Sequence, residues 1–163
     1  MKRLILMRHA KSDWSVGMPD HARPLNARGR KSAKALGDWL RAQDILPDQV
    51  LCSSAARTRE TLDLLNLGEV MTRFEDRLYL AAPATLLKGL QGASSETVLI
   101  LAHNPGIGDF AQGIVERGPD HPKFGAYPTG ATLVADFETG DWSDVRMGSA
   151  RCHAFAVPRD LLT

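Results

Sequence analysis

The feature of this sequence that most constrains its fold is an unbroken apolar run, Thr97 to Ala102, which stops abruptly at His103. A strand with one solvated face alternates polar and apolar residues, whereas a short continuous apolar run is typical of a strand covered on both faces. Such strands occur in parallel sheets that carry helices on either side. The run therefore predicts a central parallel strand in an α/β layer fold.

Strand-like and helix-like segments alternate along the rest of the chain, as they do in layered α/β proteins. We expect strands at residues 4–7, 50–52, 70–74, 97–102, 132–137 and about 153–157, the last two joined by a turn at 138–141. We expect one helix from the Asn26 cap to about Gln43, one from Ser53 or Ser54 through Leu65, one at about 84–90, and one through 107–115 that Gly118 and Pro119 stop. The fold class predicted is a single-domain, three-layer α/β sandwich with a mostly parallel central sheet.

Length and charge narrow the classes of protein. The 163 residues fit one domain, which we expect to span residues 1–163. A formal charge of +1 and a pI near 7.9 argue against nucleic acid or an anionic membrane as partner. The run Leu4–Met7 is too short for the core of a signal peptide, and no apolar stretch reaches membrane-spanning length. Cys52 and Cys152 form no C-x-x-C pair, which favours reduced thiols and a cytoplasmic location.

Polar residues interrupt the predicted elements where three strands end. Arg8 and His9 end the first strand, Ser53-Ser54 and then Arg57 follow the second, and His103-Asn104 end the central one. In an open α/β sheet, ligands bind at the carboxyl ends of the strands, where loops and helix N-termini converge. We therefore expect these positions to meet in one pocket.

Two imidazoles and at least two guanidiniums suit a phosphate. The planar fork of an arginine matches phosphate oxygens, so Arg8 and Arg57 are candidates to bind a dianion and to neutralise charge during phosphoryl transfer. A neutral histidine such as His9 is able to attack phosphorus, and a covalent intermediate divides one hard displacement into two easier ones. The sequence thus predicts an oxyanion pocket beside a nucleophile.

Three motifs resemble the histidine phosphatase superfamily, also called phosphoglycerate-mutase-like, and its short SixA-type phosphohistidine phosphatase branch. They are L-M-R-H-A at residues 6–10, S-S-A-A-R-T-R-E-T at 53–61 and A-H-N-P at 102–105, in family order. The segment R-P-L at 23–25 with Gly29, the L-Y-x-A segment at 78–81 and the small length also resemble that branch, and the resemblance spans essentially the whole chain.

The resemblance implies a role for each matching residue. His9 is then the nucleophile that becomes phosphorylated, and Arg8, Arg57 and His103 complete the phosphate pocket. Arg23 either adds a further phosphate contact, pairs with Asp20 or is solvated. Members of this kind need no metal, so neither a metal site nor a cofactor is expected.

The sequence departs from the family pattern at two points. Ala10 replaces the usual glycine after the nucleophile, which would be strained if that position required a positive φ. The carboxylate that many members use as general acid has no clear match, since Glu75, Asp76 and Asp13 are only approximate candidates. A missing acid favours a reactive phosphoramidate over an alkyl phosphate ester as substrate.

Three functions follow as alternatives. The leading one is a phosphohistidine phosphatase that acts on a phosphorylated protein, because a chain this short leaves little room for a lid and predicts a shallow site. The second is a phosphatase or mutase for a small phosphorylated metabolite, and the third is a phosphoprotein-binding module without turnover. A metal-dependent hydrolase is the least favoured.

The basic stripe Arg28, Arg30, Lys31 and Lys34 is interpreted as a hydrated helix face, with an acidic protein partner as the alternative. Trp14 is a candidate for the rim of the site, and His21, His121 and His153 are interpreted as ordinary.

Overall fold

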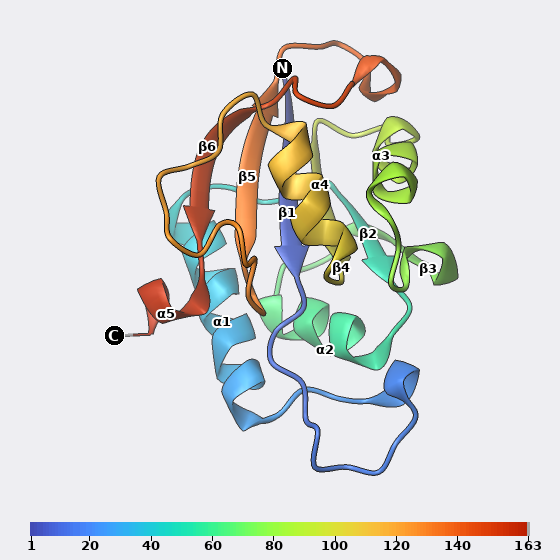
Figure 1. Cartoon of the computed structure of the whole chain (residues 1–163), viewed down its shortest axis with the longest axis vertical. Coiled ribbons are helices and arrows are strands. Elements are labelled where there is room, and N and C mark those ends of the chain that lie inside the picture. Colours follow the sequence, from blue (N-terminus) through green and yellow to red (C-terminus); the bar gives the residue numbers. More distant parts are fainter. Residues whose placement is uncertain (163) are drawn as a thin grey trace.

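The computed structural model describes residues 1–162 and contains one six-stranded sheet in the order β3-β2-β4-β1-β5-β6. The strands are β1 (Lys2–Arg8), β2 (Gln49–Ser53), β3 (Met71–Glu75), β4 (Thr97–Ala102), β5 (Thr132–Phe137) and β6 (Arg151–Ala156). Neighbours among the first four in this order pair in parallel, while β5 is antiparallel to both β1 and β6. The carboxyl ends of β1, β2 and β4 therefore share one edge, at the lower end of Figure 1.

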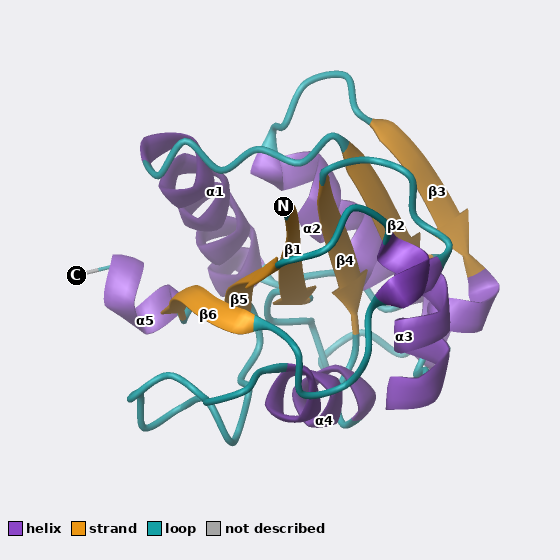
Figure 2. Ribbon diagram, turned by 90° about the horizontal axis from the view of Figure 1, so that it is seen from above, coloured by secondary structure: helices purple, strands orange, loops and turns teal. Residues whose placement is uncertain are grey.

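Helices cover both faces of this sheet, so the molecule has three layers (Figure 2). The helices are α1 (Ala27–Ala42), α2 (Ala56–Leu65), α3 (Pro83–Gln91), α4 (Gly106–Ile114) and the short α5 (Pro158–Leu161), with 3-10 turns at Asp20–Ala22, Asp76–Leu78 and Trp142–Asp144. The pairs α1 with α2 and α3 with α4 pack against each other on opposite faces. The predicted three-layer α/β sandwich with a mostly parallel sheet is confirmed.

Successive side chains of β1 point alternately into the two hydrophobic cores on either side of the sheet. Leu4 and Leu6 belong to the core beneath α3 and α4, whereas Ile5 and Met7 belong to the core beneath α1 and α2. All four side chains are fully buried. Burial of an aliphatic side chain contributes roughly 1.5–3 kcal/mol, so a strand buried on both faces is stabilised by every residue. This explains the continuous apolar runs of the central strands.

Two details of the elements differ from the sequence prediction. Helix α4 ends at Ile114, ahead of the expected stop at Gly118, because Val115 turns into an extended conformation and bridges to Ala150. Helix α2 begins after Ala55, whose side chain cannot cap, although the hydroxyl of Ser53 accepts a hydrogen bond from the backbone N–H of Ala55 at 3.3 Å. Neither change moves the strand ends that carry the candidate site.

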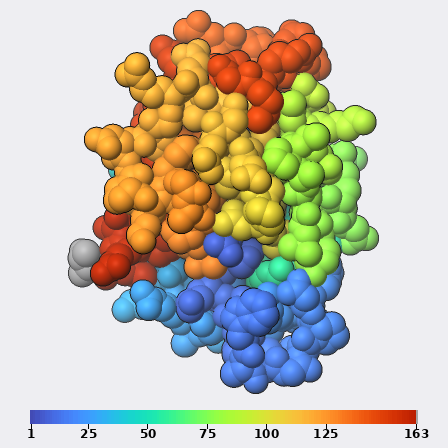
Figure 3. All heavy atoms as spheres, in the orientation of Figure 1, coloured from blue at the N-terminus to red at the C-terminus, as the bar shows by residue number. Residues whose placement is uncertain are grey.

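The segment between β1 and α1 is held close to the sheet edge by a glycine. An ideal Cβ on Gly29 would lie 2.0 Å from the backbone oxygen of Lys11, so α1 approaches Lys11 more closely than any side chain would allow. The backbone N–H of Asn26 also donates to the Lys11 oxygen at 3.0 Å. These contacts fix the chain directly after His9. The space-filling view shows this N-terminal segment, in blue, forming the lower end of the molecule (Figure 3).

No helix in the described part of the chain is long and apolar enough to cross a membrane.

Candidate active site

The structure brings Arg8, His9, Arg57, His103 and Arg23 to one pocket of about 460 Å³ at the carboxyl ends of the parallel strands. The register of the sheet explains this: Arg8 of β1 pairs with Ala102 of β4, so His9 and His103 are the next residues of two neighbouring strands. Their ring centroids lie 5.2 Å apart. The five residues predicted from three strand ends and one loop therefore line a common cavity.

The hydrogen bonds of His9 determine which nitrogen of its ring carries a proton. Nδ1 lies 2.7 Å from the backbone oxygen of Ala10, and since a carbonyl oxygen only accepts, Nδ1 must be the protonated nitrogen. Nε2 then has a lone pair, and the Nε–H of Arg57 donates toward it at 3.4 Å. The ring is held with an unprotonated nitrogen beside the pocket, which is the form that attacks an electrophile.

Burial keeps both imidazoles neutral. His9 is 5% exposed and His103 is 1% exposed. Loss of water lowers the pKa of His9 to about 3, with the nearby positive charges of Arg8 and Arg57 adding smaller effects in the same direction. Burial and then the charge of Arg57 lower the pKa of His103 to about 3 as well. At neutral pH neither ring competes with the guanidiniums for an anion.

The guanidiniums of Arg8 and Arg57 both line this pocket and are anchored by different backbone oxygens. Nη1 of Arg8 donates to the backbone oxygen of Tyr127 at 3.2 Å, while Nη1 of Arg57 donates to the backbone oxygen of Asp20 at 2.8 Å. Burial, and then the neighbouring charge of Arg57, lower the pKa of Arg8. Such a mutual repulsion between two cations is relieved by a bound anion.

Two buried nitrogen atoms of this site have no hydrogen-bond partner among residues 1–162. They are Nε of Arg8 and Nδ1 of His103, and no other buried side-chain nitrogen or oxygen of the described residues is unpaired. The other nitrogen of His103, Nε2, lies 2.7 Å from the hydroxyl of Ser53. An unsatisfied buried polar group costs about 1–3 kcal/mol. Because both unpaired nitrogens belong to the same site, they point to a functional requirement there.

Asp20, which the sequence analysis did not place in the site, pairs there with two guanidiniums, those of Arg57 and Arg23. Oδ2 of Asp20 accepts from Nη2 of Arg57 at 3.1 Å, and Oδ1 accepts from Nη2 of Arg23 at 2.8 Å. The Tyr79 hydroxyl also donates to Oδ2. These partners, Arg23 first, hold the pKa of Asp20 well below its usual range. The short spacing of Asp20 and Arg23 indicated that they pair. The contacts of Asp20 with Arg57 and Tyr79 depend on the path of a loop, which the sequence does not reveal.

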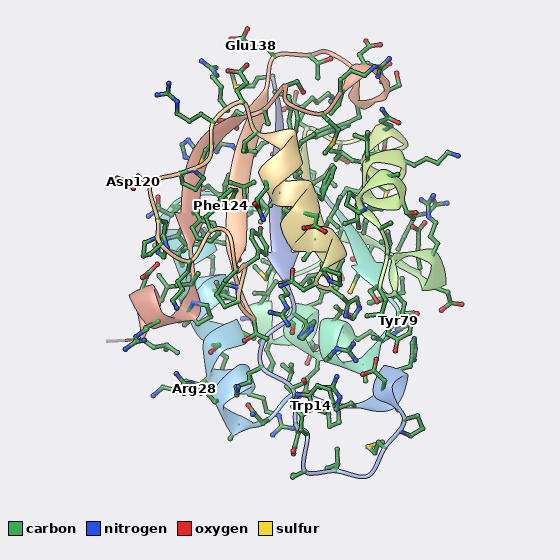
Figure 4. The ribbon with its side chains drawn as sticks, in the orientation of Figure 1. Trp14, Arg28, Tyr79, Asp120, Phe124 and Glu138 are labelled. Carbon is green, nitrogen blue, oxygen red and sulfur yellow. The ribbon has the colours of Figure 1, made fainter. Side chains whose placement is uncertain are left out.

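Arg23 pairs with Asp20, as one of its alternative predictions had it, and it also lines the pocket, while its contact with phosphate stays a prediction. Its guanidinium donates to the Ser12 hydroxyl and stacks on Trp14, with 3.6 Å between Cζ and the centroid of the ring. Trp14 is 77% exposed and lies at the mouth of the pocket, as expected for a rim residue. Trp14 and Tyr79 both lie at the end of the sheet where β1, β2 and β4 finish (Figure 4).

None of the suggested general acids lines the pocket. Glu75 pairs with Arg77 at 2.8 Å, and Asp13 accepts from the backbone N–H of Ser15 at 2.8 Å. Asp76 begins the 3-10 turn that follows β3. Among residues 1–162, Asp20 is thus the only carboxylate on the pocket wall, and its lowered pKa keeps it ionised.

Ala10 does not need the conformational freedom of a glycine. The non-glycine residues with positive φ in the described chain are Asp44, Asn66, Leu80 and Tyr127, and Ala10 is not among them. Leu80 lines the pocket, and the backbone oxygen of Tyr127 accepts from Arg8. Asp44 and Asn66 follow helices α1 and α2, whereas Leu80 and Tyr127 bring strained backbone, which is often found at functional sites, to the pocket.

The remaining metal and histidine candidates lie outside the pocket. Within residues 1–162 no three His, Cys, Asp or Glu side chains gather as a metal site would require. Cys52 and Cys152 are free thiols, and burial raises the pKa of Cys52 to about 12. His121 pairs with Asp160, and Nε2 of His21 lies 2.9 Å from the Ser54 hydroxyl; neither histidine lines the pocket.

The fold and the pocket together define a class: an α/β protein with a cationic pocket, suited to an oxyanion, beside a neutral and oriented imidazole. Residues 4–79 match the model of the histidine phosphatase superfamily, branch 1. The chain is 37% identical to an uncharacterized protein of Mycobacterium leprae, over 94% of this chain and all of that protein. It is 26% identical to the phosphohistidine phosphatase SixA of Escherichia coli, over 65% of this chain and 70% of that protein.

A solved structure shows the same family likeness in the fold. The protein proposed to be the phosphohistidine phosphatase SixA of Nakamurella multipartitia superposes with a TM-score of 0.86 and 30% identity, covering 96% of each chain. This chain therefore belongs to the histidine phosphatase superfamily, in its SixA-type branch, as its three motifs predicted.

Proposed function

We propose that this protein hydrolyses phosphohistidine on a protein substrate through a covalent phospho-His9 intermediate. One observation carries the proposal: the bond from Nδ1 of His9 to the Ala10 oxygen leaves Nε2 unprotonated inside a pocket of guanidiniums. The membership of the family, and the likeness to proteins named phosphohistidine phosphatase SixA, support the same activity.

The first step transfers the phosphoryl group to His9. The lone pair of Nε2 forms a bond to phosphorus while the P–N bond of the substrate breaks. The leaving ring is able to take a proton from solvent on its second nitrogen beforehand, so it departs as neutral imidazole. His9 retains its Nδ1 proton throughout, because the Ala10 oxygen continues to accept it.

The second step restores the enzyme. A water molecule attacks phosphorus, the bond to Nε2 breaks, and dihydrogen phosphate leaves with both protons of the water. His9 returns to its neutral form. The buried surroundings that lower its pKa disfavour the cationic phosphorylated ring, and so they make His9 a better leaving group in this step.

The other predicted residues stabilise the phosphoryl group. Arg8 and Arg57 both line the pocket, and the planar donor sets of their guanidiniums suit the three equatorial oxygens of the transferring group. The unpartnered Nε of Arg8 and Nδ1 of His103 are further groups that an oxyanion would satisfy. Arg23, fixed between Asp20 and Ser12, supplies a third positive charge at the pocket wall.

The ionised state of Asp20 supports a phosphoramidate as substrate. An alkyl phosphate ester needs a proton donor for its leaving oxygen, and general acids contribute roughly 10²- to 10⁴-fold to such reactions. With Asp20 held as a carboxylate, the pocket wall offers no carboxylic acid. A phosphorylated imidazole that is already protonated on its second nitrogen departs as neutral imidazole without this help, so phosphohistidine suits the site better than a phosphorylated sugar or glycerol.

A substrate panel tests the proposal against its alternatives. The wild type and His9→Asn are incubated with a phosphohistidine peptide, free phosphohistidine, and sugar and glycerol phosphates, with and without a chelator. We expect rapid hydrolysis of the phosphohistidine substrates by the wild type, unchanged by chelator, and none by His9→Asn. Equal or faster hydrolysis of the alkyl esters would favour the metabolite enzyme, and binding without turnover would favour the recognition module.

A further inference from the structure

A second pocket, of about 290 Å³, adjoins the first. Lys11 and Thr129 line both cavities, so the two lie side by side on the molecule. The second pocket lies between the N-terminal segment, α1, the segment before β5 and the C-terminal helix α5. In Figure 3 these four segments meet at the lower left of the face shown. We refer to this second pocket as the basic groove.

Positive charge dominates the basic groove. Its charged lining residues are Lys11, Arg28, Lys123 and Arg159, and no acidic side chain of residues 1–162 joins them. All four are exposed, and in the described chain none makes a salt bridge or a side-chain hydrogen bond. The whole chain has a formal charge of only +1, so the cluster does not reflect a generally basic surface.

The groove is more than the hydrated face of one helix. Its four cations come from four separate segments of the chain, and only Arg28 belongs to the basic stripe on α1. Figure 4 shows Arg28 projecting from the N-terminal end of α1. Gly29 holds this end of α1 against the backbone of Lys11, which fixes two of the cations relative to His9.

Apolar groups form the floor between these charges. Val157 is buried, and Pro128 and Pro158 are partly buried; the buried Ser32 adds a polar hydroxyl to this lining. A glutamate side chain has matching parts, since its methylene groups fit an apolar floor while its carboxylate reaches a cation at the edge. A pocket with this arrangement suits a chain that carries several carboxylates.

We propose that the basic groove docks an acidic segment of the substrate protein, a few residues away from its phosphohistidine. This inference rests on the proposed function, because it extends the same site along the substrate chain. Single exposed ion pairs contribute only about 0–1 kcal/mol, so four scattered cations bind usefully only a ligand that engages several of them together. An acidic peptide segment does this, whereas a single small anion does not.

The test compares peptides that differ only beside the phosphohistidine. One peptide has glutamates there, the other has serines and glycines, and free phosphohistidine is the third substrate. The double variant Arg28→Glu/Arg159→Glu reverses two charges that line only the basic groove. We expect its kcat/KM to fall about tenfold for the acidic peptide and to stay unchanged for the other two substrates.

Lys31→Glu/Lys34→Glu is the matched control, because it reverses two exposed cations of α1 that line neither pocket. We expect this variant to retain the preference for the acidic peptide. In the wild type the preference should shrink as salt is added, since exposed charges are screened. An unchanged rate on the acidic peptide in the double variant would overturn the inference, as would an equal loss on all three substrates with a normal thermal transition.

A binding measurement separates failure of the groove from failure of the proposed function. A fluorescent peptide with the same glutamates but no phosphohistidine is titrated with the wild type and with the double variant, and its anisotropy is followed. Tighter binding by the wild type supports docking even if no phosphohistidine substrate is hydrolysed. Equal binding by both proteins overturns docking, whatever the activity measurements give.

Discussion

At the scale of single residues, the site depends on the protonation states that burial imposes on its side chains. Asp20 is the clearest case, because a carboxylate inside a phosphatase pocket invites assignment as the general acid. Its contacts with Arg23, Tyr79 and Arg57 favour the ionised form and so argue against that role. Asp20 is better described as a positioning residue that orients two guanidiniums.

This interpretation predicts a mild effect of Asp20→Asn. The amide retains the shape and one acceptor oxygen, so we expect kcat/KM for a phosphohistidine peptide at neutral pH to stay within about tenfold of the wild type. Loss of a true general acid costs roughly 10²- to 10⁴-fold. A loss of that size, with a shifted acid limb in the pH profile, would show that Asp20 donates a proton.

The two buried imidazoles predict how stability depends on pH. An unfolded histidine has a pKa near 6.5, whereas the pKa of His9 and of His103 in the folded protein is about 3. Between these values the unfolded state binds more protons, so the free energy of unfolding falls as the pH falls. At pH 5 the loss is about 2 kcal/mol for each ring.

Urea unfolding at pH 7 and pH 5 measures this loss. The double variant His9→Asn/His103→Asn is the comparison, and we expect a much weaker pH dependence from it. The interval stays above the ordinary range of carboxyl groups, so acidic residues contribute little. Identical pH dependence in the two proteins would mean that these rings titrate normally.

At the scale of elements, one close approach positions the site. An ideal Cβ on Gly29 would lie 2.0 Å from the backbone of Lys11, and neither α1 nor the chain after His9 has a flexible group there to move aside. We expect Gly29→Ala to lower the free energy of unfolding by about 1–3 kcal/mol, the usual cost of overpacking, and to lower kcat/KM as well. Gly140→Ala is the control, since no atom lies within 4 Å of its ideal Cβ. Equal unfolding midpoints for the two variants would contradict the assigned contact.

The sequence predicted most elements because their signals are local. The apolar run from Thr97 to Ala102 and the cap at Asn26 each determine an element without distant information. The end of α4 was misplaced because Val115 leaves the helix to bridge Ala150, a pairing that no local pattern reveals. The place of Asp20 was missed for the same reason, since only the path of its loop brings it to Arg57 and Tyr79.

At the scale of the whole molecule, the strand order binds distant parts of the chain into one sheet. The first strand, β1, lies between β4 and β5, so its pairing needs residues from the middle and from the last third of the sequence. No point along the chain divides this sheet into two independent units.

We therefore expect one cooperative unfolding transition. Far-ultraviolet circular dichroism reports the helices, and tryptophan fluorescence reports the surroundings of Trp39 on α1 and of Trp142, which is buried near α3, together with the exposed Trp14. The two signals should change at the same urea concentration, as in other small two-state domains. Separate midpoints would show that part of the chain unfolds alone.

The most direct measurement is capture of the covalent intermediate. The protein is mixed with a phosphohistidine peptide that carries a radiolabelled phosphoryl group, and the reaction is stopped with alkali within the first turnover. Mass spectrometry should then find the label on His9, in an acid-labile linkage, and His9→Asn should carry none. A label on another residue, or full turnover by His9→Asn, would contradict transfer through this imidazole.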